Sequence, residues 1–353
     1  MQVSDFSFDL PDELIAQEAA PRGESRMLTL HRASGAIRHG RVRDLPDELE
    51  PGDLLVINDT RVFAARLLGR RVPSGGAVEC LLLGAAIERA PDGSARFEAL
   101  VHPGQKLKPG ARVRFEGSSG GIDGEILERR FFGRRAVRLT PDSGGDLDAL
   151  VDAIGHVPLP PYIHRGDAAA DRERYQTVYA RERGSVAAPT AGLHFTPGLL
   201  DAIAARGVVR VPVTLHVGYG TFKPIRSAIV EEHVVDPEPY EIGEAAAAAI
   251  AEARSDGRRV IAVGTTTTRA LEDAARRGGG VVRPGRAQAE IFMYPGFRFE
   301  VIDGLLTNFH LPQSSLLMLV AAFAGRERVL EAYREAVRER YRFYSYGDAM
   351  LVL

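Results

Sequence analysis

Residues 260–269, V-I-A-V-G-T-T-T-T-R, form a short apolar run that ends at a glycine and continues into four threonines. The apolar run predicts a buried strand over 259–264, and the residues after it predict a helix over 265–276 that glycines stop at 278–280. A strand followed directly by a helix is the repeating unit of α/β folds. We therefore expect an α/β domain in this part of the chain.

The same alternation extends outward in both directions. The patterns predict helices at 199–205, 243–254, 314–324 and 326–340, strands at 27–31, 53–58 and 208–217, and a short helical stretch at 11–19. The last five residues, A-M-L-V-L, are apolar and predict a buried final strand rather than a frayed tail.

Between residues 62 and 140 the pattern changes. Short β-branched and leucine-rich runs, separated by Gly, Pro and Ser, occur at 77–83, 96–101, 111–115, 124–128 and 135–139. This spacing is typical of a small antiparallel barrel or sandwich. We expect an α/β main domain with a mixed or barrel-like sheet, made of residues 1–61 and 151–353, with a small antiparallel β-barrel domain inserted at 62–150.

The composition is that of an ordinary globular protein, with 353 residues, 45% hydrophobic and 26% charged, and a formal net charge of −2. No stretch is long and apolar enough to span a membrane, and the first residues do not resemble a signal peptide, so we expect a cytoplasmic location. Cys80 is the single cysteine, which excludes intrachain disulfides and thiolate metal clusters. Because the net charge gives no general attraction to nucleic acid, an RNA site would need a local basic patch.

Four loops rich in small and hydroxyl side chains follow or join predicted strands, at 185–197, 216–224, 263–269 and 307–315. In the first, S-V-A-A-P-T-A-G-L-H-F-T-P, small residues leave space beside the backbone, and Thr196 and Pro197 are typical of a helix N-cap and first helical position. A bound ligand would explain that space. A plain structural loop is the alternative, since such loops are common and most histidines are hydrogen-bonded structural residues.

The loops also carry groups suited to chemistry. The first-turn N–H groups after Gly264 favour an anion, although four threonines also make an ordinary N-cap region. Neither a Walker A motif nor G-x-G-x-x-G occurs. Four histidines in or near the loops are suited to proton transfer or metal binding: His194, His216, His233 and His310. A metal-dependent hydrolase using His216, His233 and Glu231 or Glu232 is one alternative function, although no H-E-x-x-H is present.

A predicted hairpin in the inserted region carries Phe131 and Phe132 among five arginines, namely Arg129, Arg130, Arg134, Arg135 and Arg138. Such a segment is either an RNA-contacting edge or a solvated charged hairpin. The second is the commoner case.

Long stretches in order along the whole chain match one known pattern. They are F-D-L-P-D-E-L-I-A-Q at 8–17, V-I-N-D-T-R-V at 56–62, L-P-P-Y-I at 159–163, E-R-Y-Q-T-V-Y-A at 173–180, the loop at 185–197, H-V-G-Y-G-T-F-K-P at 216–224, A-V-G-T-T-T-T-R-A-L-E at 262–272, L-L-T-N-F-H-L-P-Q-S-S-L-L-M-L-V at 305–320 and Y-R-F-Y-S-Y-G-D-A-M-L at 341–351. In these the chain resembles the S-adenosylmethionine:tRNA ribosyltransferase-isomerase family of queuosine biosynthesis.

The resemblance implies a fold and a reaction. The fold is an α/β domain with an inserted β-barrel domain, in agreement with the patterns above. In the reaction, the ribosyl part of S-adenosylmethionine is transferred and isomerised onto the aminomethyl group of 7-aminomethyl-7-deazaguanine (preQ1) at the tRNA wobble position, and adenine and methionine leave. It implies S-adenosylmethionine as co-substrate with no further cofactor or metal, a tRNA bearing preQ1 in the anticodon as partner, and a monomer.

Such chemistry needs a base, an acid and partners for anions. The candidates for acid and base work are His194, His216 and His310. The candidates for anion binding are Lys223, Arg269 and the turn Thr265–Thr266, and those for stacking are Tyr219 and Phe222. Further substrate-binding candidates from the matched segments are Asn58, Asp59, Arg61, Pro189, Thr190, Gly192, Thr221, Asn308, Tyr346 and Asp348.

Two positions depart from the family pattern. Where the family usually has H-x-M-H-x-E, this chain has H-V-V-D-P-E at 233–238, so Asp236 stands in place of the second histidine. Where a Thr-Asp or Thr-Asn pair usually precedes I-F-I-Y-P-G, this chain has Ala289–Glu290 before I-F-M-Y-P-G. A third alternative is therefore an RNA-binding homologue that has lost catalysis.

Overall fold

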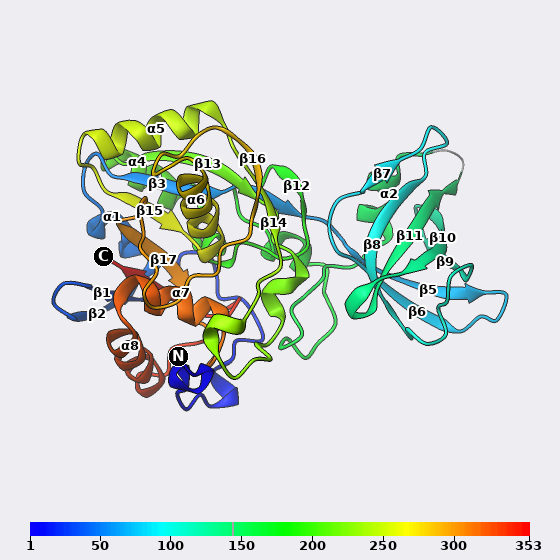
Figure 1. Ribbon diagram of the computed structural model, residues 1–353, viewed down its shortest axis with the longest axis horizontal. Helices are drawn as coiled ribbons and strands as arrows, with labels where there is room; N and C mark the ends of the chain where they lie inside the picture. Colours follow the sequence, from blue (N-terminus) through cyan, green and yellow to red (C-terminus); the bar gives the residue numbers. More distant parts are fainter. Residues whose placement is uncertain (143–144) are drawn as a thin grey trace.

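The computed structural model describes residues 1–142 and 145–353 and contains a large mixed sheet and a separate barrel to one side of it (Figure 1). Nine strands form the large sheet in the order β16-β14-β13-β3-β15-β17-β18-β1-β2. They are β1 Arg26–Leu30, β2 Ile37–Arg41, β3 Leu54–Asn58, β13 Val209–Leu215, β14 Glu238–Ile242, β15 Val260–Val263, β16 Gly285–Ala289, β17 Gly304–Asn308 and β18 Ala349–Val352. The expected α/β domain is confirmed, with a mixed sheet.

Helices cover both faces of this sheet because its central strands are apolar on both sides. In β3, Leu54 and Val56 belong to a core with helices α5, α6, α7 and α8, whereas Leu55 and Ile57 face α1 and α4. Period-two alternation of side chains explains why neighbouring residues of one strand serve different layers. The helices are α1 Leu45–Glu48, α3 Asp171–Arg174, α4 Pro197–Ala205, α5 Glu244–Ser255, α6 Thr265–Arg277, α7 Ser315–Ala324 and α8 Arg326–Arg338.

Most elements lie where the sequence predicts them. The helix after the 185–197 loop begins as expected, with Thr196 accepting a hydrogen bond from the Leu199 N–H at 3.0 Å and Pro197 in the first turn. The C-terminal strand β18 is fully buried and pairs with β1 and β17. None of the helices in the described residues is long and apolar enough to cross a membrane.

The inserted region forms a closed antiparallel barrel with its own apolar core. Its strands are β5 Arg66–Val72, β6 Ala77–Leu82, β7 Glu88–Arg89, β8 Ala95–His102, β9 Arg112–Gly117, β10 Gly120–Arg129 and β11 Arg134–Pro141, and β11 pairs with β8 to close it. Helix α2, Leu147–Ile154, packs Leu147 and Val151 into the barrel core. The predicted domain boundary at residue 150 therefore falls inside α2. A separate two-stranded parallel sheet is formed by β4 Thr60–Val62 and β12 Glu182–Ser185.

One sequence prediction needs correction, and one strand of the barrel was not predicted. The helical stretch expected at 11–19 is only a 3₁₀ turn at Asp12–Leu14, because Ile15 leaves it in extended conformation and bridges Phe343 near the C-terminus. Strand β5 was not predicted, because its arginines and Gly69 interrupt the alternation of apolar residues. Gly69 is needed there, since an added Cβ would overlap the carbonyl oxygen of Arg114 on the neighbouring strand.

Candidate active site

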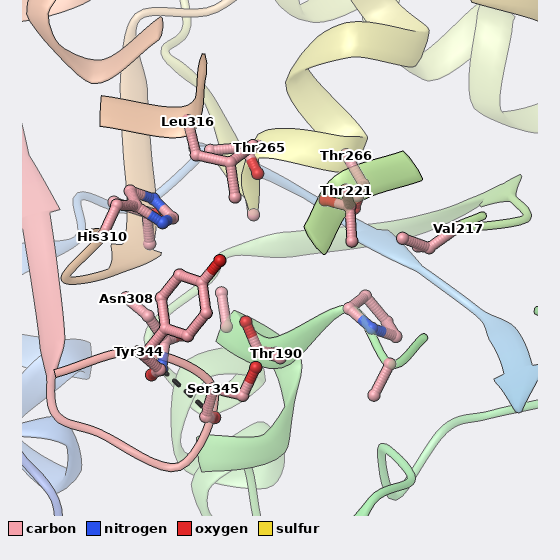
Figure 2. Close-up of a pocket in the computed structure, with 15 residues that line it drawn as sticks. Thr190, Val217, Thr221, Thr265, Thr266, Asn308, His310, Leu316, Tyr344 and Ser345 are labelled. Atoms are coloured by element: carbon pink, nitrogen blue, oxygen red, sulfur yellow. Dashed lines mark hydrogen bonds between the residues drawn. The ribbon is translucent and has the colours of Figure 1, made fainter. Parts of the chain in front are cut away.

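A pocket lies where the carboxyl ends of β15 and β17 meet the loops that the sequence singled out (Figure 2). These strands are parallel neighbours, so their carboxyl ends share one edge of the sheet, the usual place for a ligand in α/β folds. The open space is about 500 Å³. Its walls combine small and hydroxyl-bearing residues: Ala188, Pro189, Thr190, Ala191, Val217, Thr221, Gly264, Thr265, Thr266, Thr307, Asn308, His310, Leu316, Tyr344 and Ser345.

One wall is the start of helix α6. Gly264 has φ 93° and ψ 152°, a backbone conformation that only glycine adopts without strain, and it turns the chain from β15 into the helix. The hydroxyls of Thr267 and Thr268 donate to the carbonyls of Val263 and Gly264, which immediately precede the helix. Thr265 and Thr266 instead line the pocket beside the positive end of the helix, which suits an anionic group of a ligand.

His310, in the loop after β17, also lines the pocket, with its ring beside it (Figure 2). Its Nε2 is 2.9 Å from the Thr307 hydroxyl, and its backbone N–H donates to the hydroxyl of Tyr333 at 3.1 Å. Burial lowers the pKa of His310 to about 3. The ring is therefore neutral near pH 7 and only weakly basic, which suits it to hydrogen-bond a ligand.

His194 lies behind the wall and does not line the pocket. Its side chain is buried, and burial lowers its pKa to about 4 against smaller raising effects of Asp348 and Asn308. The Nε2 of His194 and the Oδ1 of Asn308 are both buried without a partner of good hydrogen-bond geometry. Because Asn308 does line the pocket, His194 is placed to act on a ligand through this amide.

The loop around His194 is less roomy than its sequence suggests. Residues Thr190–His194 form a 3₁₀ turn, and an added Cβ on Gly192 would overlap the hydroxyl of Tyr179 and the methyl group of Thr177. Gly192 thus makes room for the protein's own side chains. Within this loop, Pro189 and Thr190 line the pocket, and their role in substrate binding stays a prediction.

Tyr344 and Ser345 line the pocket, whereas Tyr346 and Asp348, which were predicted from the sequence, do not. Tyr344 has φ 76°, uncommon for a tyrosine, and burial raises its pKa to about 12, so its hydroxyl stays protonated near neutral pH. The hydroxyl of Tyr346 donates to Asp171 at 3.0 Å, and Asp348 accepts the backbone N–H groups of Arg26 and Arg342. The sequence carries no signal that distinguishes the pocket-lining residues of this turn from its other residues.

A second pocket of about 580 Å³ adjoins the first, and Thr221 and Leu316 line both. Arg269 lies in it but is not a free cation, because it forms an ion pair with the buried carboxylate of Glu238. Burial raises the pKa of Glu238, which also accepts the Gly218 N–H at 2.9 Å. The remaining walls are Gly220, Lys223, His233, Val234, Val235, Asp236, Ile291, Phe292, Met293, Ser315 and Leu319.

Several predicted residues line neither pocket. His216 binds the Thr60 hydroxyl through Nδ1 at 2.8 Å, and burial lowers its pKa. Asn58 joins strands β3 and β13 and binds the hydroxyl of Thr266, so it supports the first pocket from behind.

Others of the predicted set have their own positions in the fold. Asp59 accepts from the Thr214 hydroxyl at 2.6 Å and forms an ion pair with Arg181. Arg61 is exposed on β4, and Tyr219 packs against the barrel core. The side chain of Phe222 lies outside the part of the chain that the structure describes.

The residues of the metal hypothesis do not converge. Glu231 binds the N-terminal ammonium at 2.8 Å, and His233 packs edge-on against Phe292. Across residues 1–142 and 145–353, no group of three or more His, Cys, Asp or Glu side chains is arranged to hold a metal ion. Cys80 is free and buried in the barrel core, where burial raises its pKa to about 12.

Acidification is expected to destabilise the fold. His194 and His310 are buried with pKa values lowered to about 4 and about 3, while in the unfolded chain both titrate near 6.5. The unfolded state therefore binds more protons, and stability that is present above pH 6.5 is lost as the pH falls. At about pH 5 the loss is about 2 kcal/mol for each histidine. Urea unfolding at about pH 7.5 and about pH 5 measures this loss of stability. The His310→Asn variant should lose less stability than the wild-type protein between these pH values. Equal pH dependence in the variant and the wild-type protein would mean that His310 is not a source of the loss.

Known proteins resemble this chain along its whole length. A model of the family described as queuosine biosynthesis protein matches residues 3–352. Proteins named S-adenosylmethionine:tRNA ribosyltransferase-isomerase from Pelotomaculum thermopropionicum and Heliobacterium modesticaldum are 52% and 51% identical over 354 residues, with 100% of both chains covered. The crystal structure of S-adenosylmethionine tRNA ribosyltransferase from Thermotoga maritima is 38% identical, has a TM-score of 0.55, and matches 99% of this chain and 100% of that one.

Proposed function

The chain belongs to the queuosine biosynthesis protein family, and on this premise we propose that its paired pockets carry out the ribosyl transfer and isomerisation for which its relatives are named. S-adenosylmethionine donates the ribosyl group, and the 7-aminomethyl group of preQ1 at the wobble position of tRNA accepts it. Adenine and methionine leave, and the tRNA carries epoxyqueuosine.

One observation supports this function most directly: two pockets adjoin and share Thr221 and Leu316. A transfer between a sulfonium nucleoside and a tRNA base needs two compartments whose reacting atoms meet at a common wall. A reacting base must also leave its stack to enter such a compartment. The monomer expected from the sequence stays a prediction, and a tRNA substrate fits a cytoplasmic location.

The first pocket fits the sulfonium nucleoside. The methionine carboxylate is matched by the N-terminus of α6 and the hydroxyls of Thr265 and Thr266. His310 and the protonated hydroxyl of Tyr344 are hydrogen-bonding groups for the ribose and the departing adenine. In the second pocket, Glu238 offers carboxylate oxygens to donors on a deazaguanine, while Arg269 balances its charge.

The low pKa values of the two buried histidines restrict their roles in this reaction. At pH 7 a histidine of pKa about 4 is protonated in about one molecule in a thousand, and one of pKa about 3 in fewer still. His310 therefore serves as a neutral hydrogen-bond partner of the substrate, and His194 as a positioning residue behind Asn308. The departing adenine needs its proton from another donor, such as water or the phenol of Tyr344.

Adenine release tests the function. Purified protein with S-adenosylmethionine and tRNA carrying preQ1 is expected to release adenine and methionine in equal amounts, and a tRNA with unmodified guanine at the wobble position serves as control. Intact S-adenosylmethionine at saturating enzyme would overturn the proposal in favour of an RNA-binding homologue. Activity that a chelator removes and a divalent metal restores would instead favour the metal-dependent hydrolase.

A further inference from the structure

The tip of the β10–β11 hairpin carries two phenylalanines that the protein's own packing does not use. Phe131 is 87% exposed and Phe132 is 86% exposed. Val234, at the rim of the second pocket, is 85% exposed, whereas the other exposed large hydrophobic residues of the described chain lie between 40% and 56%. Leaving rings of this size in water forgoes the free energy of burial, which points to a surface that contacts a partner.

The backbone at this tip adds to that evidence. Phe132 has φ 54° and ψ 33°, in the left-handed region, and Gly133 follows with φ 80°. Asn, Asp or Gly would adopt the first of these positions at lower cost than a phenylalanine. The turn therefore presents an aromatic ring to solvent where a small polar residue would serve the fold better.

The rings lie beside positive charge. Arg129 and Lys108 are exposed and line an open groove of about 1100 Å³ next to the hairpin, with Lys106 exposed in the same loop. Arg130 and Arg134 contribute less, because Glu128 and Glu98 pair with them. Among the described residues, Arg129 and Lys108 form no ion pair. Aromatic faces next to such cations are suited to unpaired nucleotides, whose bases stack and whose phosphates are anionic.

The hairpin is tied to the rim of the second pocket. Arg134, at its base, forms an ion pair of 2.9 Å with Asp236, and Asp236 also binds Lys223 at 2.6 Å. Asp236 and Lys223 both line that pocket, and Val234 lies two residues from Asp236. Asp236, one of the two departures from the family pattern, thus links the barrel to the second pocket. The two segments that it joins carry the exposed residues Phe131, Phe132 and Val234.

Resting on the tRNA modification proposed above, we propose that the tip residues Phe131 and Phe132, with Arg129 and Lys108 beside them, bind unpaired nucleotides of the tRNA that flank the reacting base. The rings stack on bases, and the two cations face phosphates. The bridge from Arg134 to Asp236 holds this contact beside the pocket that receives the base.

The test compares two variants on the same barrel. F131A/F132A removes both rings, whereas Ile87→Ala removes an exposed apolar side chain (56% exposed) near the start of β8, away from the hairpin. We expect the dissociation constant and the KM for tRNA to rise at least about tenfold in F131A/F132A and to stay near the wild-type values in Ile87→Ala. The dissociation constant for S-adenosylmethionine and the circular dichroism spectrum should stay unchanged in both.

A second variant tests the charges. K108A/R129A is expected to weaken tRNA binding and to lower the slope of log affinity against log salt by about 1.4, because two phosphate contacts are lost. An unchanged slope together with unchanged tRNA affinity in F131A/F132A would overturn the inference. So would normal tRNA binding with an altered oligomeric state, which would make the tip a contact between copies of the chain. Absence of adenine release by the wild-type protein would instead count against the proposed function, since tRNA binding is measured separately.

Discussion

Replacing His310 with alanine is expected to lower kcat at least about 100-fold, the usual range for loss of a hydrogen-bonding group that acts on the transition state. The ring lies in the wall of the first pocket, and Thr307 occupies its Nε2, which leaves the other ring nitrogen for a ligand. Because burial lowers its pKa to about 3, the imidazole stays neutral at working pH. Single-turnover release of adenine measures this step without product dissociation.

Two variants separate chemistry from packing at this position. His310→Asn keeps a polar side chain and should bind S-adenosylmethionine normally while remaining slow. Thr307→Val removes the hydroxyl that orients the ring and should lose about tenfold, as expected for a positioning residue. A His310→Ala protein with normal kcat but a lower midpoint of thermal unfolding would make His310 a core residue only.

The alternation of strands and helices was predictable because local signals agree with the global fold. Gly264 marks the end of a strand and the glycines at 278–280 mark the end of the helix that follows, and the structure has β15 and α6 between them. The loops after β15 and β17 meet at one edge, as parallel neighbouring strands require. Thr265, Asn308 and His310 were therefore predictable as neighbours.

Tertiary contacts also engage some of the predicted site residues in ways that a local pattern does not show. Asp59 has the form of a binding residue in N-D-T-R, but Thr214 and Arg181 occupy its carboxylate. Arg269 follows the threonine turn like an anion binder, yet Glu238 reaches it from β14 across the sheet. Partners so distant in sequence are set by strand order, which one chain's pattern does not reveal.

The assignment of Tyr344 to the pocket shows a second limit. The segment around it mixes aromatic and polar residues without a clear period, so its pattern does not show which residues of the turn face the ligand. The positive φ of Tyr344 determines which residues of the turn face the pocket. Two hydrogen bonds hold this conformation: the Phe309 carbonyl accepts the Tyr344 N–H, and the Asn308 amide donates to the Tyr344 carbonyl.

His194 and Asn308 are expected to act as one unit, so their losses should not multiply. His194→Ala and Asn308→Ala are each expected to lower kcat/KM about 30- to 100-fold, and the double variant should lose no more than the worse of the two. The reason is geometric: Asn308 lines the pocket, His194 lies behind it, and each has a buried polar atom that lacks another partner. Removing His194 leaves the amide of Asn308 wrongly oriented for the ligand, and removing Asn308 leaves no amide for His194 to orient.

The comparison of the single and double variants needs a measurement that a purely structural role would not change. The amide of Asn308 also donates to the carbonyl of Tyr344 at 2.9 Å, so Asn308→Asp keeps its shape but replaces that donor, and the pH dependence of kcat should change in Asn308→Asp alone. Multiplied losses in the double variant would mean that His194 reaches the substrate by another route. Full activity of His194→Ala would make the histidine structural and leave Asn308 as the group that contacts the ligand.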